Sequence, residues 1–286
     1  RLTDVTGVQT CALPILSLAP SRFDLAPHPL ELQAVSRVSR KIEQAAEKSE
    51  IIVITHFHHD HFTPFYEQEY TEVNRSIYER KKIYVKSCGQ NINQNQKKRS
   101  GQFVENFPPH RQPIPCDGKV IDNLSFSPAF PHGEEGRNVF LVMVAIRHGD
   151  EVFVHGSDIQ CIQAESVEWI LGKRPKTVFV SGPPIYLSKI SEEIKHRANE
   201  NIKKMAQRIP LLILDHHLLR TLDYERFLSE AREIAEKEGN RILSGAQYMG
   251  FTPNLLEARR KELYSSETPP TDRKSTRLNS SHVSQS

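Results

Sequence analysis

Four side chains able to bind a metal ion, His56, His58, Asp60 and His61, lie within six residues of one another. The apolar residues 51–54 just before them have the composition of a buried strand. Side chains two residues apart on an extended backbone point to the same side, so the rings of His56 and His58 share one face. Asp60 and His61 follow where the chain must turn. Imidazoles and a carboxylate gathered at a strand end can form a transition-metal site with room for a reactive water.

The spacing His-x-His-x-Asp-His in this segment resembles the signature of the metallo-β-lactamase-fold superfamily. In that superfamily the first two histidines and a distant third hold one metal ion. The aspartate and the fourth histidine hold a second ion, a later aspartate bridges the two ions, and a last histidine completes the set. His59 falls at a variable position of the signature, and we expect its ring to point away from the metals.

Two distant residues match the rest of this pattern. His132 lies between Pro131 and Gly133 after an expected strand, and the resemblance implies that it is the third histidine. Asp158 follows a strand that ends in a turn containing Gly156, which is the setting of the superfamily's bridging aspartate. The resemblance therefore places His132 on the first ion and Asp158 between the two ions.

The last ligand of the pattern is a histidine at a strand end near the C-terminus. His216 and His217 both fit that position, and the sequence leaves the choice between them open. The histidine that is not a ligand could orient Asp158 or the substrate, and Asp215 could hold the second ring nitrogen of a ligand. Tyr186 lies in a loop beyond another expected strand, where open α/β sheets tend to place their sites.

The resemblance extends to one uncharacterised branch of predicted metal-dependent hydrolases in this superfamily and covers about residues 18–265. It is carried by the segments PHPLEL, THFHHDHFTPF, PAFPHGEEG, GSDIQ, SGPPIYL and LDHHLLR, which begin at residues 27, 55, 128, 156, 181 and 214. This chain departs from the branch at its start, where a foreign string replaces the opening β-hairpin.

The function that the resemblance implies is metal-dependent hydrolysis, with Asp60 and Asp158 as the catalytic carboxylates. A hydroxide that bridges two divalent ions would attack a phosphoester, ester or related bond. Neutral imidazoles with carboxylates fit Zn²⁺ best, and Mn²⁺ and Fe²⁺ are the alternatives. Two other functions stay open: an iron-dependent redox enzyme on the same fold, and a non-catalytic metal-binding module that fills a single site.

The resemblance implies a small-molecule or phosphoester substrate as the expected partner. The net charge of +3 is too weak by itself to indicate nucleic acid, which only the Lys-Lys-Arg run at 97–99 supports. Because no window holds 18 apolar residues, we expect no membrane span. The widely spaced cysteines, Cys11, Cys88, Cys116 and Cys161, are typical of free thiols in a reducing compartment, here the cytoplasm. The sequence indicates no oligomeric state.

The two ends of the chain differ from the rest. Residues 1–15 and the tail at 269–286 resemble translated sequencing-adapter read-through, and the tail is rich in Ser, Thr, Asn and Arg without an apolar period. We expect both to be foreign and disordered, which leaves residues 16–268 as the domain.

Strands and helices must bring these distant residues together. Apolar periodicity predicts helices at 29–48, 64–80, 161–172, 189–208, 223–238 and 254–264, and strands at 51–55, 82–86, 119–130, 138–147, 151–155, 176–181, 211–214 and 241–244. The polar residues 89–101 are expected to form a solvated loop or helix face. Strands that cluster and then alternate with helices indicate an α/β protein. With the resemblance, the expected fold is a four-layer αββα sandwich, the metallo-β-lactamase fold without its opening β-hairpin.

Overall fold

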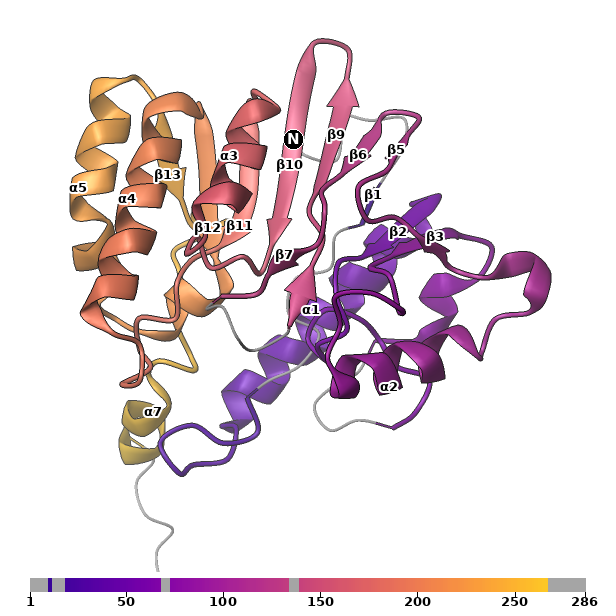
Figure 1. Cartoon of the computed structure of the whole chain (residues 1–286). Helices are drawn as coiled ribbons and strands as arrows, with labels where there is room; N and C mark the ends of the chain where they lie inside the picture. Colours follow the sequence, from indigo (N-terminus) through magenta and orange to yellow (C-terminus); the bar gives the residue numbers. More distant parts are fainter. Residues whose placement is uncertain (1–9, 12–18, 68–72, 134–138, 267–286) are drawn as a thin grey trace, which may run out of the picture.

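The computed structural model describes residues 10–11, 19–67, 73–133 and 139–266, and its strands form two main sheets (Figure 1). The first sheet is parallel, in the order β1-β2-β3-β4. Its strands are β1 (Thr10–Cys11), β2 (Ile51–Ile54), β3 (Lys82–Val85) and β4 (Ile114–Pro115).

The second sheet has the order β13-β12-β11-β10-β9-β6-β5 and is mixed. Pairing is antiparallel from β5 to β10 and parallel from β10 to β13. Its strands are β5 (Val120–Ile121), β6 (Leu124–Phe126), β9 (Val144–His148), β10 (Glu151–Ser157), β11 (Thr177–Ser181), β12 (Leu211–Asp215) and β13 (Arg241–Leu243). Strands β7 (Phe130–Pro131) and β8 (Phe140–Leu141) form a separate antiparallel pair.

The described helices connect these strands. They are α1 (Pro29–Glu47), α2 (Gln94–Val104), α3 (Ala164–Gly172), α4 (Glu192–Arg208), α5 (Tyr224–Lys237), α6 (Gly245–Tyr248) and α7 (Arg260–Ser266). Three 3₁₀ turns are η1 (Arg75–Tyr78), η2 (Pro109–Arg111) and η3 (His216–Arg220). His28 is the N-cap of α1: its Nδ1 accepts the backbone N–H of Leu30, and the carboxylate of Glu31 accepts the backbone N–H of His28.

Alternation along the strands divides the core into layers. In β2, Ile52 and Ile54 pack with Ile42 of α1 and Phe103 of α2, whereas Val53 faces the second sheet. A separate cluster contains Val53 and Tyr84 of the first sheet together with Phe126 and Val144 of the second. This cluster is therefore the seam between the two sheets.

A third hydrophobic cluster lies on the outer face of the second sheet. Val154 of β10 and Leu212 of β12 pack with Ile170 of α3, Met205 of α4 and Leu228 of α5. Helices thus cover the outer faces of both sheets, and Figure 1 shows α3, α4 and α5 on one side of the molecule and α1 and α2 on the other. The expected α/β class and its four-layer αββα sandwich are confirmed.

The expected helix at 64–80 is wrong for the part of it that the structure describes. Residues 64–67 are irregular, and only η1 is helical after them. The hydroxyl of Tyr78 accepts the N–H of Thr63, and the ring of Phe65 packs against those of Tyr78, Phe103 and Phe107. These tertiary contacts hold the segment in a shape that overrides its weak helical periodicity.

Two other expected segments differ in part from the structure. The polar segment at 89–101 contains the first part of a helix, α2, with Lys97 and Lys98 exposed and Phe103 buried. The helix expected at 254–264 begins later, as α7, and is preceded by the short α6. The hairpin expected around Gly149 is present, with β9 and β10 antiparallel.

The two ends lie mostly outside the described residues. Of the leader at 1–15, only Thr10–Cys11 is described, as strand β1 paired in parallel with β2, and the tail at 269–286 lies wholly outside. Cys88, Cys116 and Cys161 are free thiols. Among the described residues no helix is both long and apolar enough to cross a membrane.

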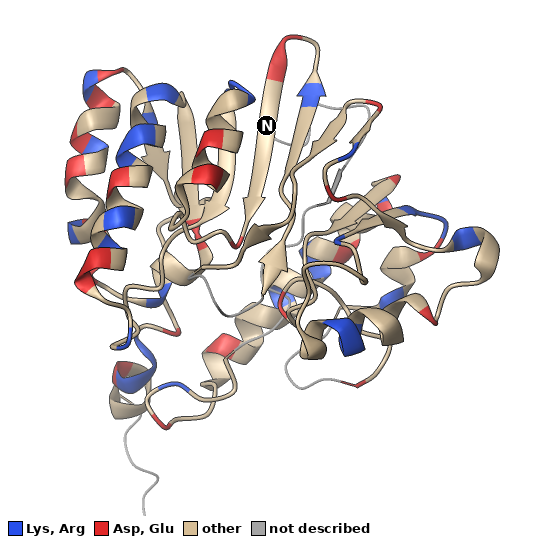
Figure 2. Cartoon of the chain, in the orientation of Figure 1, with Lys and Arg blue, Asp and Glu red and all other residues tan. Residues whose placement is uncertain are grey.

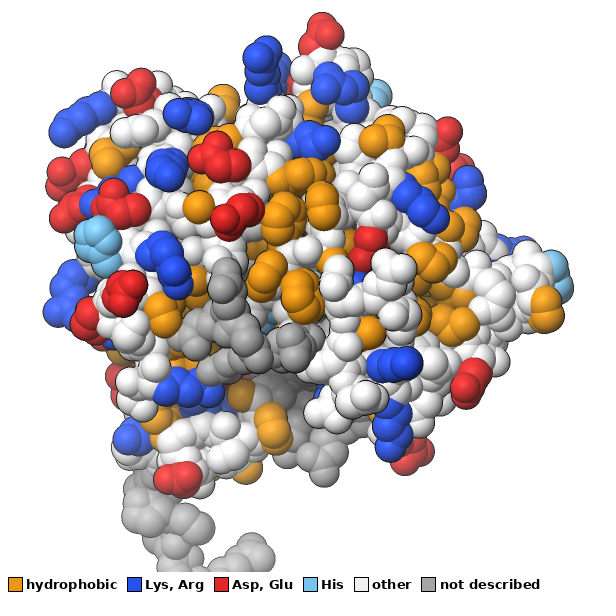
Figure 3. All heavy atoms as spheres, viewed as in Figure 1, with side chains coloured by type: hydrophobic (Ala, Val, Ile, Leu, Met, Phe, Trp, Pro, Cys, Tyr) orange, Lys and Arg blue, Asp and Glu red, His pale blue; other side chains and the backbone are white. Residues whose placement is uncertain are grey.

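Charged and hydrophobic side chains gather over different elements of the surface in this view (Figure 2, Figure 3). Lysine and arginine mix with aspartate and glutamate along α4 and α5 (Figure 2). Hydrophobic side chains reach the surface over β10 and β7 (Figure 3).

Candidate metal centre

The predicted ligands meet at one edge of the sandwich because strands of both sheets end there. His56 follows β2, Asp158 follows β10, and His216 follows β12, each directly beyond the carboxyl end of its strand. His132 follows β7, and its backbone N–H bonds the carbonyl of Val139. Distant segments are thereby brought to the place where α/β sheets usually bind ligands.

Ligand atoms of all eight predicted side chains converge into three overlapping groups. Within each group the candidate atoms lie within 4.8 Å of one another. The groups are His56, His58, His132 and Asp158; Asp60, His61 and His216; and Asp158, His216 and His217. The first group contains the three histidines that the resemblance assigns to the first ion. It shares Asp158 with the third group, and the third group shares His216 with the second.

Individual distances show how closely the two sets approach each other. Nε2 of His61 lies 3.9 Å from both Asp60 Oδ2 and Asp158 Oδ2. Nε2 of His216 lies 3.3 Å from Asp60 Oδ2 and 3.7 Å from Asp158 Oδ2. The ring of His132 contacts Asp158 directly and lies 4.7 Å, centroid to centroid, from that of His58.

Several of these atoms are buried without a hydrogen-bond partner. They are His56 Nε2, His61 Nε2, both ring nitrogens of His216, and Asp158 Oδ1. A buried polar atom that lacks a partner destabilises the fold by about 1–3 kcal/mol, so convergence of several of them needs a compensating group. Imidazole nitrogens and carboxylate oxygens in this arrangement are a donor set that fits divalent transition-metal ions.

Burial and charge keep the carboxylates ionised. Burial alone would raise the pKa of Asp158, but the neighbouring His132, His217 and His216 outweigh it and hold that pKa well below its usual range. Burial opposes ionisation of Asp60 in the same way, and His61 and His216 again lower its pKa. Both carboxylates therefore carry the negative charge that a metal ligand needs at neutral pH.

The histidines divide into two electrostatic groups. Burial lowers the pKa of His56 and His61, takes the pKa of His58 to about 3, and takes that of His217 to about 4. These rings are neutral near pH 7. Burial also disfavours the charged form of His216, but Asp158 and Asp60 outweigh it and raise the pKa of His216 to about 9. In the metal-free protein His216 is thus a proton-carrying partner of the carboxylates.

A chain of two hydrogen bonds, on the side of the ring away from the cluster, orients His56. Thr55 Oγ1 lies 3.3 Å from Nδ1 of His56 and accepts the hydroxyl of Ser157 at 2.7 Å. Because Ser157 belongs to β10 and Thr55 follows β2, this pair also joins the two sheets at the site. A partner on Nδ1 leaves Nε2 of His56 directed into the cluster.

The turns that present the ligands use left-handed backbone conformations. Ser157, just before Asp158, has φ +53°, and His216 has φ +58°. Such φ values are uncommon for residues other than glycine and are often found at functional sites. Gly156 precedes Ser157 in β10. A Cβ at this position would lie 2.8 Å from the side chain of Val180 in β11, so the close approach of the two strands requires glycine.

Two further sequence expectations have clear outcomes. His59 turns away from the cluster as expected, and its Nε2 bonds the hydroxyl of Tyr66 at 3.0 Å. The expectation that Asp215 holds a ligand's ring nitrogen is wrong. Its carboxylate accepts the backbone N–H groups of His216 and Gly245, at 2.7 and 2.8 Å, and thereby shapes the turn after β12.

Tyr186, a sequence candidate, reaches the edge of the site together with two arginines that sequence reasoning missed. Its hydroxyl lies 3.3 Å from Nδ1 of His217 and accepts Nη1 of Arg220 at 3.3 Å. The guanidinium of Arg22 stacks on the Tyr186 ring, 4.1 Å from its centroid. Nothing in the local sequence around Arg22 or Arg220 indicates this position, because Arg22 contacts Arg220 across 198 positions and Arg220 contacts Tyr186 across 34.

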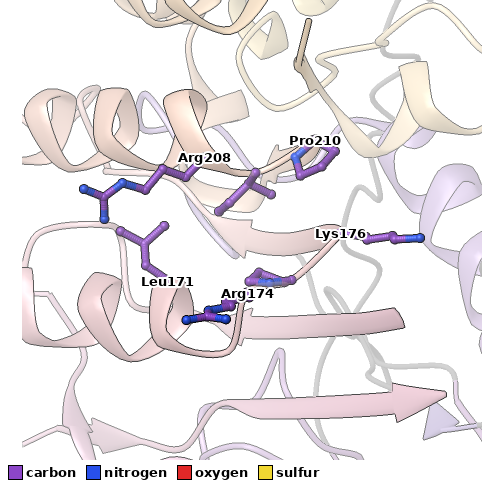
Figure 4. Close-up of a pocket in the computed structure, with 7 residues that line it drawn as sticks. Leu171, Arg174, Lys176, Arg208 and Pro210 are labelled. Carbon is purple, nitrogen blue, oxygen red and sulfur yellow. The ribbon is translucent and has the colours of Figure 1, made fainter. Parts of the chain in front are cut away.

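A surface hollow of about 410 Å³ lies elsewhere in the molecule. It is lined by Leu171, Arg174, Pro175, Lys176, Arg208, Ile209 and Pro210 (Figure 4). These residues lie beside the amino-terminal starts of β11 and β12, whereas the candidate ligands follow the carboxyl ends of strands in the same sheet. The hollow is therefore separate from the metal centre.

The four-layer fold and the His/Asp cluster at the strand ends agree with what the resemblance in the sequence implies. No family model matches the chain. It is 36% identical over 275 residues to a UPF0282 protein of Thermococcus onnurineus, covering 92% of this chain and 89% of that one. It is 39% identical over 254 residues to a UPF0282 protein of Methanosarcina mazei, covering 88% and 82%. The chain belongs to the UPF0282 family.

Two solved structures are less similar to this chain than the UPF0282 relatives are. A CmlA β-hydroxylase mutant is 12% identical, with a TM-score of 0.44 over 82% of this chain and 48% of its own. Igni18, a metallo hydrolase from Ignicoccus hospitalis, is 14% identical, with a TM-score of 0.38 over 68% of this chain and 76% of its own. Both TM-scores are below 0.5, so we draw nothing about activity from these two structures.

Proposed function

We propose that the protein is a metal-dependent hydrolase with two divalent ions, Zn²⁺ by preference, acting on a phosphoester, ester or related bond of a small molecule. The observation that carries this proposal is the convergence of six imidazoles and two carboxylates into three ligand groups, two of which contain Asp158, with several buried ring nitrogens left without a hydrogen-bond partner. We place it in the cytoplasm, which the three described free thiols support.

In this proposal the side chains form two ligand sets. His56, His58 and His132 would hold the first ion. Asp60, His61 and His216 would hold the second, and Asp158 would bridge the two. When bound, such a pair of ions supplies Lewis acidity and lowers the pKa of water from about 15.7 to near 7.

The protein's own groups prepare the site for this chemistry. Asp60 and Asp158 are ionised and mostly neutral imidazoles surround them, so the ligands are ready to bind without a large change of protonation. Burial excludes bulk water from His56 and Asp158, which are 0% and 1% exposed. Electrostatic stabilisation of a developing negative oxygen is stronger in such a site than in water.

A substrate screen with matched variants tests the proposal. Metal-loaded protein is assayed on phosphodiesters, phosphomonoesters, thioesters and lactones, with chelated protein alongside. We expect hydrolysis of at least one class, its loss on chelation, and its loss in Asp60→Ala with a nearly unchanged far-UV spectrum.

His59→Ala is the control from the same motif, since its ring bonds Tyr66 and lies outside the three ligand groups. It should keep the activity of the wild type. Metal-independent hydrolysis, or full activity in Asp60→Ala, would remove the two-metal proposal.

A further inference from the structure

Two arginines share one carboxylate beside the metal centre. Nε of Arg22 lies 3.9 Å from Oε1 of Glu257, and Nε of Arg220 lies 3.4 Å from Oε2 of the same side chain. Within the described part of the chain, neither guanidinium forms an ion pair with a second carboxylate. Because arginine keeps its charge at any ordinary pH, the three side chains together carry one positive charge in excess.

Both guanidinium groups are largely buried. The side chains of Arg22 and Arg220 are 14% and 17% exposed. Nε of Arg22 is buried without a hydrogen-bond partner, because 3.9 Å is too long for a hydrogen bond to Glu257. A charge that is largely removed from water destabilises the protein unless an opposite charge reaches it. The excess charge therefore indicates a place for an anion.

Tyr186 connects the two arginines to the metal centre. Its hydroxyl lies 3.3 Å from Nη1 of Arg220 and 3.3 Å from Nδ1 of His217, whose Nε2 is 3.1 Å from Asp158 Oδ2. The guanidinium of Arg22 stacks on the ring of Tyr186. We call Arg22, Arg220 and Tyr186 the cationic rim. An anion held by this rim would lie close to the carboxylate that is proposed to bridge the ions.

The backbone that presents Arg22 is strained. Phe23 and Asp24 have φ +57° and +61°, and two backbone hydrogen bonds between Arg22 and Leu25 close a turn around them. This conformation is unfavourable for residues other than glycine, above all for a bulky one such as phenylalanine, and it is found most often at functional sites. Arg260 supports the turn by donating to the carbonyl of Leu25. The turn thus holds Arg22 where local backbone preferences would not place it.

We propose that the cationic rim binds an anionic group, a carboxylate or a phosphate, which the substrate carries in addition to the bond that is cleaved. The guanidinium N–H groups of Arg22 and Arg220 supply charged donors for it. Asp60 and Asp158 do not provide the missing negative charge, because they are assigned to the two ligand sets. The inference names the class of substrate for the proposed hydrolase, and its catalytic meaning rests on that proposed function.

Calorimetric titration of the full chain with inorganic phosphate tests the rim directly. We expect Arg220→Gln to weaken phosphate binding by at least about tenfold, because it removes a charged donor. Glu257→Gln should act in the opposite direction and strengthen binding by about threefold or more, because it removes the negative charge beside both guanidinium groups. If Glu257 only held the two arginines in place, its loss would weaken binding instead.

The matched controls are Lys176→Gln and Glu151→Gln. They make the same changes of charge in an exposed ion pair at the opposite end of the second sheet, and they should leave phosphate affinity unchanged. A wild type that binds no phosphate, an Arg220→Gln variant with wild-type affinity, or a Glu257→Gln variant without tighter binding would overturn the inference. We expect the same order of affinities with and without zinc. A chain that takes up no zinc would therefore remove the proposed function and leave this test decisive.

Turnover tests the class of substrate. Within each class that the protein hydrolyses, a compound with a free carboxylate is compared with its amide. We expect a lower KM and a higher kcat/KM for the acid, and loss of this preference in Arg220→Gln. Equal kcat/KM values for the acid and the amide in the wild type would overturn the inference.

Discussion

Arg260→Met should destabilise the protein far more than the same change at the next position, Arg259. Arg260 and Glu31 form a two-bond ion pair, with N–O distances of 2.8 and 2.9 Å, and their side chains are 0% and 1% exposed. Removing the arginine leaves a buried carboxylate that still accepts a hydrogen bond from the N–H of His28, at 2.8 Å. Breaking one side of a buried pair costs about 3–5 kcal/mol of the free energy of unfolding.

Arg259 provides the matched comparison. Its pair with Glu262 has a distance of 2.9 Å, but the side chains are 48% and 56% exposed, so water screens the interaction. Arg259→Met should therefore change the free energy of unfolding by about 0–1 kcal/mol. At roughly 2–4 °C per kcal/mol for a chain of this size, Arg260→Met should lower Tm by about 10 °C.

Equilibrium urea unfolding, followed by far-UV circular dichroism in the presence of chelator, measures both variants against the wild type. The double variant Glu31→Gln with Arg260→Met should recover part of the loss, because it removes the unpaired charge. Arg260 also donates to the carbonyls of Leu25 and Ala19, so this pair fastens the segment that carries Arg22. Equal stabilities of the two single variants, within 1 kcal/mol, would refute the reasoning.

Further predictions concern the metal centre. Thr55→Val removes the partner of His56 Nδ1 and should weaken metal affinity by about 10–100-fold, measured by competition with a chelating dye. Thr63→Val, at a buried hydroxyl without a hydrogen-bond partner, should leave the affinity unchanged, and equal effects of the two changes would contradict this role. The raised pKa of His216 stabilises the metal-free fold fully below pH 6.5, and this contribution is lost as pH rises through about 9. Urea unfolding with chelator should therefore show stability falling across that window, with a smaller fall in His216→Gln; a wild-type curve that rises would contradict the sign.

The periodic pattern of the sequence predicted the α/β class, and the resemblance to a known superfamily implied the four layers and the eight candidate ligands. The structure brings these eight side chains together at the ends of strands from both sheets, where α/β sheets usually place their sites. The helix expected after Thr63 failed because aromatic contacts with residues from other segments decide that shape.

Other features depend on contacts that no local pattern indicates. The Arg260–Glu31 pair joins residues 229 positions apart, and the Tyr186–Arg220 contact at the edge of the site joins residues 34 positions apart. His216 and His217 also differ in structure, because His216 has a left-handed backbone conformation whereas His217 contacts the hydroxyl of Tyr186. Neither can be read from two adjacent histidines.

Elemental analysis of purified chains, titrated with Zn²⁺ and freed of excess ions, tests the two-metal centre most directly. We expect two ions per chain in the wild type and in His59→Ala, and fewer than two in Asp158→Asn, whose carboxylate would bridge both ions. A wild-type protein with one ion or none, or an Asp158→Asn variant that retains two, would contradict the account.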